Sequence, residues 1–242
     1  MNSALLGVIA SCLTVPRDPD FSDVGLLLHG DGVMGSTTHT DSGPYHHTQS
    51  AGTAAQISNT QVKWGTGSAQ TGGGGWGVGA IVFDDHASLQ ASTENFTIEM
   101  WIYPTAVFGP QLLISKSIGT GFFPYQLYLD NDKLRFKGYD TGPVLAFDIT
   151  GATTIANNTW YFVQARRNGG NVDITLNGVV DASGAITGGA GATLYSGAGT
   201  QMLIGDFYPL SSTPFIGFID DFRFTKNVVR SATIPTAAFP DA

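Results

Sequence analysis

The chain has 242 residues, enough for one large all-β domain or two ordinary domains, and 42% of them are hydrophobic, which is ample for a sizeable core. Charged residues make up only 12%, against about 25% in a typical soluble domain, while glycine occurs 32 times. A net charge of -8, spread thinly along the chain, argues against a nucleic-acid partner.

The first twenty residues differ from the rest of the chain. Residues 4–15 are apolar, but no Lys or Arg precedes them, as a signal peptide requires, and the stretch is too short to span a bilayer. The single cysteine, Cys12, excludes an internal disulfide. Residues 1–20 are therefore expected to form an apolar arm.

Short apolar runs predict the first strands of the domain. Residues 24–28 are uninterrupted Val, Gly and Leu, which fits burial on both faces of a sheet. A long loop of Gly, Ser, Thr, His and Asp follows. Shorter strands are then predicted at 55–58, 62–64 and 80–83.

The clearest strand runs over 96–104. Four apolar residues alternate there with Thr97, Glu99, Trp101 and Tyr103, the period of two that a strand requires, before Pro104 ends the ladder. Because Trp101 and Tyr103 make the second face largely aromatic, both faces need cover. The strand therefore belongs in the middle of a sheet, with another layer packed against it.

The remaining strands include a meander over 159–180, whose turns are 168–171 and Asn177-Gly178. They are predicted at 111–116, 125–130, 133–137, 145–149, 159–167, 172–176, 179–180, 201–205 and 215–224. No helical period of ten residues appears. Prolines in 228–242 prevent a regular strand or helix there. We expect a domain at 21–227 followed by an extended tail at 228–242, with neither tail completing the sandwich.

Six stretches in this order resemble the laminin G-like, concanavalin A-like jelly roll. They are 96–102, 113–116, 158–163, 176–178, 203–205 and 215–223. The resemblance implies an all-β, two-sheet antiparallel jelly-roll sandwich in which the first and last strands of the domain are neighbours. Residues 24–32 further resemble the version of this domain found in bacteriophage structural proteins.

No catalytic residues are expected. An enzyme of this fold that cleaves sugars needs two carboxylates across the scissile bond. The only glutamates are Glu94 and Glu99, five residues apart, and Glu99 lies inside the central strand, where the family also places a Glu. No nucleophile motif is present, and the lone cysteine lies in the arm. The sequence therefore predicts that the protein is not an enzyme.

Two groups of residues are candidate metal ligands. His39, Asp41 and His46 match no rigid ligand spacing, so hydrogen-bonding or exposed histidines are favoured there. The resemblance implies a structural calcium between the first loop and the last strand, for which Asp31, Asp41 and Asp221 offer oxygen ligands.

The alternative to calcium is a purely structural role for these carboxylates. Asp31 would then cap a turn, and Asp220 would pair with Arg223. Only one of the neighbours Asp220 and Asp221 can face the core of a regular strand, and a core-facing carboxylate needs a partner.

Aromatic residues are frequent in the predicted loops. If they converge, they form either a sugar-stacking platform or a protein interface, and neighbouring Pro and Leu favour the interface. The candidates are Trp76, Phe122, Phe123, Phe207 and Tyr208.

We therefore expect a non-enzymatic bacteriophage virion protein, a capsid decoration or fibre-type component that contacts other virion proteins. The alternative is a secreted or cell-surface module that binds a host or matrix glycan. No membrane partner is expected. The arm should pack against another chain, either in a homo-oligomer, with a trimer as the first expectation, or on the virion surface. A flexible arm, or one folded back on its own domain, is the alternative.

Overall fold

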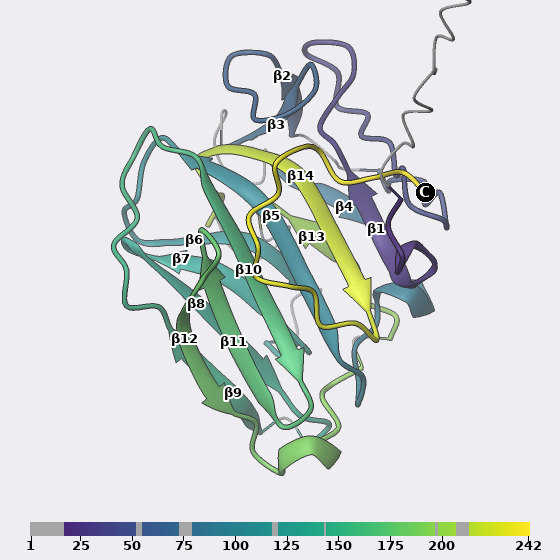
Figure 1. Cartoon of the computed structure of the whole chain (residues 1–242), viewed down its shortest axis with the longest axis vertical. Coiled ribbons are helices and arrows are strands. Elements are labelled where there is room, and N and C mark those ends of the chain that lie inside the picture. Colours follow the sequence, from purple (N-terminus) through teal and green to yellow (C-terminus); the bar gives the residue numbers. More distant parts are fainter. Residues whose placement is uncertain are drawn as a thin grey trace, which may run out of the picture.

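The computed structural model describes residues 17–51, 55–72, 79–117, 121–142, 144–196, 198–206 and 213–242. Within these ranges the chain forms fourteen strands in two antiparallel sheets that pack as a sandwich (Figure 1). The helices among the described residues are three single 3-10 turns, η1 (Phe21–Asp23), η2 (Ala87–Leu89) and η3 (Gly189–Gly191). The predicted all-β jelly-roll sandwich is confirmed.

The larger sheet has the strand order β12-β11-β10-β5-β14-β3-β2, and β1 also pairs with β14. The pairing of β1 with β14 makes the first and last strands neighbours, as the resemblance implied. The predicted central strand, β5, lies between β10 and β14. The strands are β1 (Val24–Leu28), β2 (Gln56–Ser58), β3 (Ser68–Thr71), β5 (Phe96–Pro104), β10 (Tyr161–Asn168), β11 (Asn171–Leu176), β12 (Val179–Ala185) and β14 (Gly217–Lys226).

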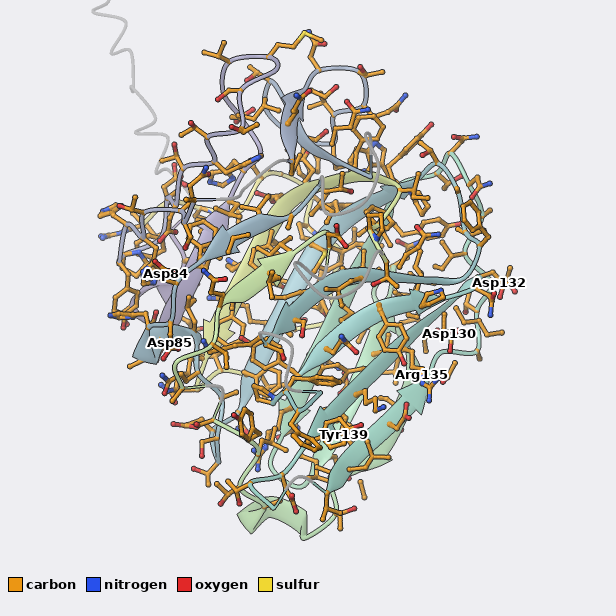
Figure 2. All side chains as sticks on the ribbon, turned by 180° about the vertical axis from the view of Figure 1, so that it is seen from behind. Asp84, Asp85, Asp130, Asp132, Arg135 and Tyr139 are labelled. Carbon is orange, nitrogen blue, oxygen red and sulfur yellow. The ribbon has the colours of Figure 1, made fainter. Side chains whose placement is uncertain are left out.

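The smaller sheet has the order β4-β13-β6-β7-β8-β9. Its outer face carries charges, among them Arg135, which pairs with Asp130 at 2.8 Å and with Asp148 at 2.6 Å (Figure 2). The strands are β4 (Ile81–Phe83), β6 (Pro110–Lys116), β7 (Gln126–Asp130), β8 (Lys133–Tyr139), β9 (Leu145–Thr150) and β13 (Met202–Ile204).

The strand predicted at 62–64 is wrong. These residues belong to a loop that turns back toward the larger sheet, where Asp220 Oδ2 accepts hydrogen bonds from the backbone N–H groups of Lys63 (2.8 Å) and Trp64 (3.1 Å). Strand β3, which pairs with β14 opposite β5, was not predicted. Its sequence, Ser-Ala-Gln-Thr, lacks the apolar alternation that marks strands elsewhere in this chain.

Strand β5 is buried on both faces, as its sequence predicts. Ile98 and Ile102 point into the main core between the sheets and are fully buried. Trp101 points to the opposite side, which we call the outer face of the larger sheet, and forms a second apolar cluster with Phe162 and Phe239. The cover for this outer face therefore comes from the C-terminal tail rather than from another sheet.

The tail, residues 228–242, crosses the larger sheet in front of β10 and β14 and ends beside β1 (Figure 1). The ring of Phe239 lies 3.8 Å from the Arg223 guanidinium. The backbone N–H of Phe239 donates a hydrogen bond to Asp221 Oδ2 at 2.8 Å. Asp18 N–H donates to the carbonyl of Ala242 at 2.7 Å. The tail contains no strand, yet it completes the outer layer, which was not expected from the sequence.

We predict that Phe239→Ala destabilises the protein by about 3–5 kcal/mol, the usual cost of truncating a buried phenylalanine. Phe239 is 6% exposed and packs from the tail against Trp101 and Phe162, whereas Phe108 is 68% exposed. Phe108→Ala is therefore the matched control and should change stability by less than about 0.5 kcal/mol. Urea unfolding of both variants measures the difference, and equal effects would contradict the role of the tail as cover.

Candidate functional site

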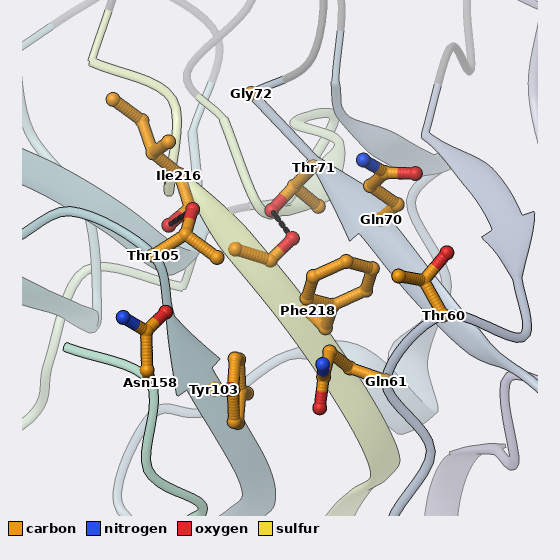
Figure 3. Close-up of a pocket in the computed structure, with 11 residues that line it drawn as sticks. Thr60, Gln61, Gln70, Thr71, Gly72, Tyr103, Thr105, Asn158, Ile216 and Phe218 are labelled. Carbon is orange, nitrogen blue, oxygen red and sulfur yellow. Dashed lines mark hydrogen bonds between the residues drawn. The ribbon is translucent and has the colours of Figure 1, made fainter.

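A groove of about 380 Å³ lies on the outer face of the larger sheet, where β3, β14 and β5 run side by side (Figure 3). This volume falls in the range of roughly 300–1,000 Å³ that small-ligand sites occupy. Its main side chains come from three strands and three loops. They are Gln61, Gln70, Tyr103, Asn158, Ile216 and Phe218.

Strand register brings the floor of the groove together. Phe218 on β14 stands opposite Gln70 on β3 and opposite Tyr103 on β5. Directly opposite residues of antiparallel strands share a face, so the three side chains form one row across the sheet. The Tyr103 and Phe218 ring centroids are 6.1 Å apart, with the planes 69° from parallel. Phe218 is 5% exposed and Tyr103 is half-buried, so Tyr103 offers the accessible ring.

The strands approach closely under the groove because Gly217 has no side chain. A Cβ at this position would lie 2.2 Å from the carbonyl oxygen of Tyr103. The carbonyl of Gly217 also accepts a hydrogen bond from the Thr71 hydroxyl at 3.3 Å (Figure 3). This contact ties β3 to β14 at the groove floor.

Asn158 and Trp160 extend the row beyond β5. Asn158 adopts the left-handed conformation, with φ of 60°, and its N–H donates to the carbonyl of Pro104 at 2.7 Å. The Trp160 ring centroid lies 5.4 Å from that of Tyr103. An exposed amide therefore lies at this open end of the groove.

The described residues that line the groove include no Asp, Glu, Lys, Arg or His. Its chemistry is that of amides, hydroxyls and aromatic rings, which suits uncharged polar ligands with an apolar face. No acid and base pair is available among these residues for hydrolysis.

The two glutamates are committed to structural contacts. Glu99 is 2% exposed. Its Oε1 accepts from Arg223 Nε at 2.6 Å, and its Oε2 accepts from Gln164 Nε2 at 2.8 Å. Glu94 accepts from the backbone N–H of Ser92 at 2.9 Å.

The three aspartates proposed for calcium each hold a loop through protein donors. Asp41, 3% exposed, accepts backbone hydrogen bonds from Leu27 at 3.0 Å and from His47 at 2.7 Å. Asp31 accepts from the Gly67 N–H at 2.9 Å, and Asp221 from the N–H of Phe239. Within the described ranges, no group of three or more His, Cys, Asp or Glu residues is arranged to hold a metal ion. A calcium site therefore stays a prediction.

The expected ion pair between Asp220 and Arg223 is wrong. A bulge at Asp221, with φ of 49°, shifts the register of β14 between the two residues. Arg223 pairs instead with Glu99 and with Asp18, the latter at 2.8 Å. Asp220 turns to the 62–64 loop, and the bulge explains how two neighbouring carboxylates are both buried.

Asp220 and His29 have shifted pKa values. Burial raises the pKa of Asp220 to about 7, and the backbone donors of Trp64 and Lys63 oppose this only in part. Burial lowers the pKa of His29, but its hydrogen bonds to Asp221 (2.7 Å) and Asp241 (2.6 Å) outweigh burial and raise that pKa to about 9. His29 thus clamps the tail to β14.

The other histidines are hydrogen-bonded, as the sequence favoured. His39 is 4% exposed, and its Nε2 lies 3.0 Å from the carbonyl oxygen of Ala55. His47 and His86 both pair with the Ser88 hydroxyl, at 3.0 and 2.9 Å.

Of the predicted aromatic set, Phe122 and Phe123 both contact Tyr139, with ring centroids 5.4 and 5.1 Å apart. Phe123 is buried and Phe122 is exposed. Tyr139 ends β8 of the smaller sheet (Figure 2), whereas the groove lies on the larger sheet. Trp76, Phe207 and Tyr208 lie outside the described residues.

The groove was not predicted from the sequence. The predicted strands at 96–104 and 215–224 contain Tyr103 and Phe218, but the sequence assigns only Tyr103 to a particular face of its strand. Gln70 and Phe218 lie far from Tyr103 in sequence, and no local pattern links them.

Among the described residues, no helix has the length and apolar character needed to cross a membrane.

The family model described as the concanavalin A-like lectin/glucanases superfamily (Laminin_G_3) matches residues 74–234, well over half of the chain. No curated protein sequence matches. Among solved structures, the chain is similar to the binding domain of Paraclostridial Mosquitocidal Protein 1, with a TM-score of 0.61 and 14% identity over 87% of this chain. It is also similar to the botulinum neurotoxin D ligand-binding domain in complex with N-acetylneuraminic acid, with a TM-score of 0.62 and 17% identity over 87% of this chain. The chain spans 50% of each of those structures.

We predict that the His29 clamp makes stability depend on pH. Because the pKa of His29 is about 9 in the folded protein and its ordinary value is 6.5, its stabilisation is fully present below pH 6.5 and is lost as pH rises through 9. His29→Gln should lower the melting temperature at pH 6 more than at pH 9.5. His86→Gln is the control, since that ring pairs with a hydroxyl rather than a carboxylate. A pH-independent effect of His29→Gln would contradict the clamp.

The calcium prediction has its own test. If Asp31, Asp41 and Asp221 hold the ion, chelation by EDTA lowers the melting temperature, because a metal that binds only the folded state stabilises it. If EDTA leaves the melting temperature unchanged and elemental analysis finds no calcium, the prediction is wrong.

Proposed function

The chain belongs to the concanavalin A-like lectin/glucanases superfamily, and we propose that it is a non-enzymatic carbohydrate-binding module whose site is the groove on the outer face of the larger sheet. The observation that carries the proposal is the cross-strand row of Gln70, Phe218 and Tyr103 in an uncharged groove. A sugar ring has an apolar face that packs on an aromatic ring and hydroxyls that bond to amides. The groove supplies both.

The carboxylates support binding rather than hydrolysis. A glycosidase needs two carboxyl groups about 5–9.5 Å apart across the scissile bond. The described groove lining has none, and Glu99 is held by Arg223 beneath the tail. We therefore assign a binding role to the groove.

The uncharged lining favours neutral sugars. One similar structure was solved with N-acetylneuraminic acid, which carries a carboxylate. An acidic sugar is held best by Arg or Lys in charge-assisted hydrogen bonds. The described groove residues include neither, so an acidic sugar would lack a partner here.

The location of the module on a bacteriophage virion, as a capsid decoration or fibre component, stays a prediction, as does the secreted or cell-surface alternative. The exposed ring of Phe122 beside Tyr139 is a surface that other virion proteins could contact. Residues 1–16 of the arm lie outside the described residues, so its docking in a trimer or on a virion stays a prediction too.

We predict that Tyr103→Ala weakens glycan binding by about tenfold or more, since a loss of roughly 1.4 kcal/mol corresponds to a tenfold change in Kd. Tyr128→Ala is the matched control, because Tyr128 is also half-buried but lies on the smaller sheet. A glycan array identifies a neutral saccharide, and calorimetry measures the affinities. If Tyr103→Ala binds as tightly as the unmodified protein, or if no glycan binds at all, the proposed function is wrong.

A further inference from the structure

We propose that the groove takes an internal segment of a linear, neutral oligosaccharide that lies across the strands, rather than a single terminal sugar. This inference rests on the proposed function and specifies its ligand. It is carried by the direction of the row, by the exposure of its ends and by the position of its amides.

The row runs perpendicular to the strands. Gln70, Phe218 and Tyr103 each come from a different strand and are in register. Neighbouring strands lie about 4.8 Å apart, so the backbone positions of Gln70 and Tyr103 are separated by about 10 Å. Asn158 extends the lining further past β5. The row is therefore longer than one pyranose ring is wide.

Both ends of the groove are exposed while its floor is buried. Thr60 and Gln70 are exposed at the β3 end, and Thr105 and Asn158 are exposed at the β5 end. Phe218, between them, is buried. A pocket for a terminal sugar needs a wall that stops the chain, whereas this arrangement lets a chain continue past both ends.

Hydrogen-bonding amides stand on either side of the aromatic centre. Gln70 lies at one end, Asn158 lies at the other, and the rings of Phe218 and Tyr103 lie between them, with Gln61 beside the two rings (Figure 3). A sugar unit on the Tyr103 ring leaves its two neighbours within reach of opposite amides. Each end therefore adds contacts only when the ligand has a unit to place there.

The test uses cello-, laminari- and manno-oligosaccharides of one to six units with the full chain, measured by calorimetry. In a series that binds, we expect Kd to fall at least tenfold from one unit to three and then to level off. A trisaccharide blocked at both ends, as a reducing-end glycoside with its non-reducing end capped, should bind like the unblocked one.

Two end variants locate the extra contacts. Gln70→Ala and Asn158→Gly should each remove most of the gain in affinity with chain length. Glycine is chosen at 158 because it adopts a φ of 60° without strain. Asn131→Gly, at the same φ in the turn between β7 and β8, and Gln126→Ala on β7 are the matched controls, and both should keep the full gain.

The possible failures are distinguishable. If one unit binds as tightly as three, or if blocking the ends abolishes binding, the groove takes a terminal sugar, and this inference is wrong while the proposed function stands. The inference is also wrong, with the proposed function intact, if both end variants keep the full gain with chain length. If no mono-, oligo- or polysaccharide binds, the proposed function is wrong and this inference falls with it.

Discussion

Glu99 carries a carboxylate in the middle strand of the larger sheet at 2% exposure, and a charge buried there has to be paired where it lies. Arg223 on the neighbouring strand and Arg230 in the tail both reach it, and Asp18 binds both arginines at 2.8 Å. The network joins the start of the described chain to its last strand and its tail. Because Arg230 takes part in it, the tail is drawn back over the sheet, where Phe239 then packs.

The same strand explains why the remaining outer face is open. The outer side chains of β5 are Thr97, Glu99, Trp101 and Tyr103, in that order. The tail covers the first three through Arg230 and Phe239, because the charge and the large indole both require burial. Tyr103 tolerates water at its hydroxyl, and the groove lies around it. Cover and site are thus two parts of one face.

Acidic residues in this chain act mainly as loop anchors. Asp31 and Asp220 each accept backbone hydrogen bonds from distant loops, and Asp41 ties its own loop to β1 through the Leu27 N–H. Asp221 fixes both His29 and the tail. These loops lack regular secondary structure, and the carboxylates satisfy backbone N–H groups that no strand pairs. The few charged residues of the chain therefore fix its loops. One of these anchors, Asp220, also holds the loop that contributes Gln61 to the groove wall.

Local sequence was enough to predict most of the strands, the central place of β5 and the need for cover on both its faces, because alternation and turn residues act over a few neighbouring positions. The path of the tail, the loop at 62–64 and the groove depend instead on contacts between distant parts of the chain. Lys63 and its anchor Asp220 are 157 residues apart, and no local period encodes that hydrogen bond. The row of Gln70, Phe218 and Tyr103 likewise depends on the register of three strands, and a shift of one residue in any of them would turn its side chain to the opposite face.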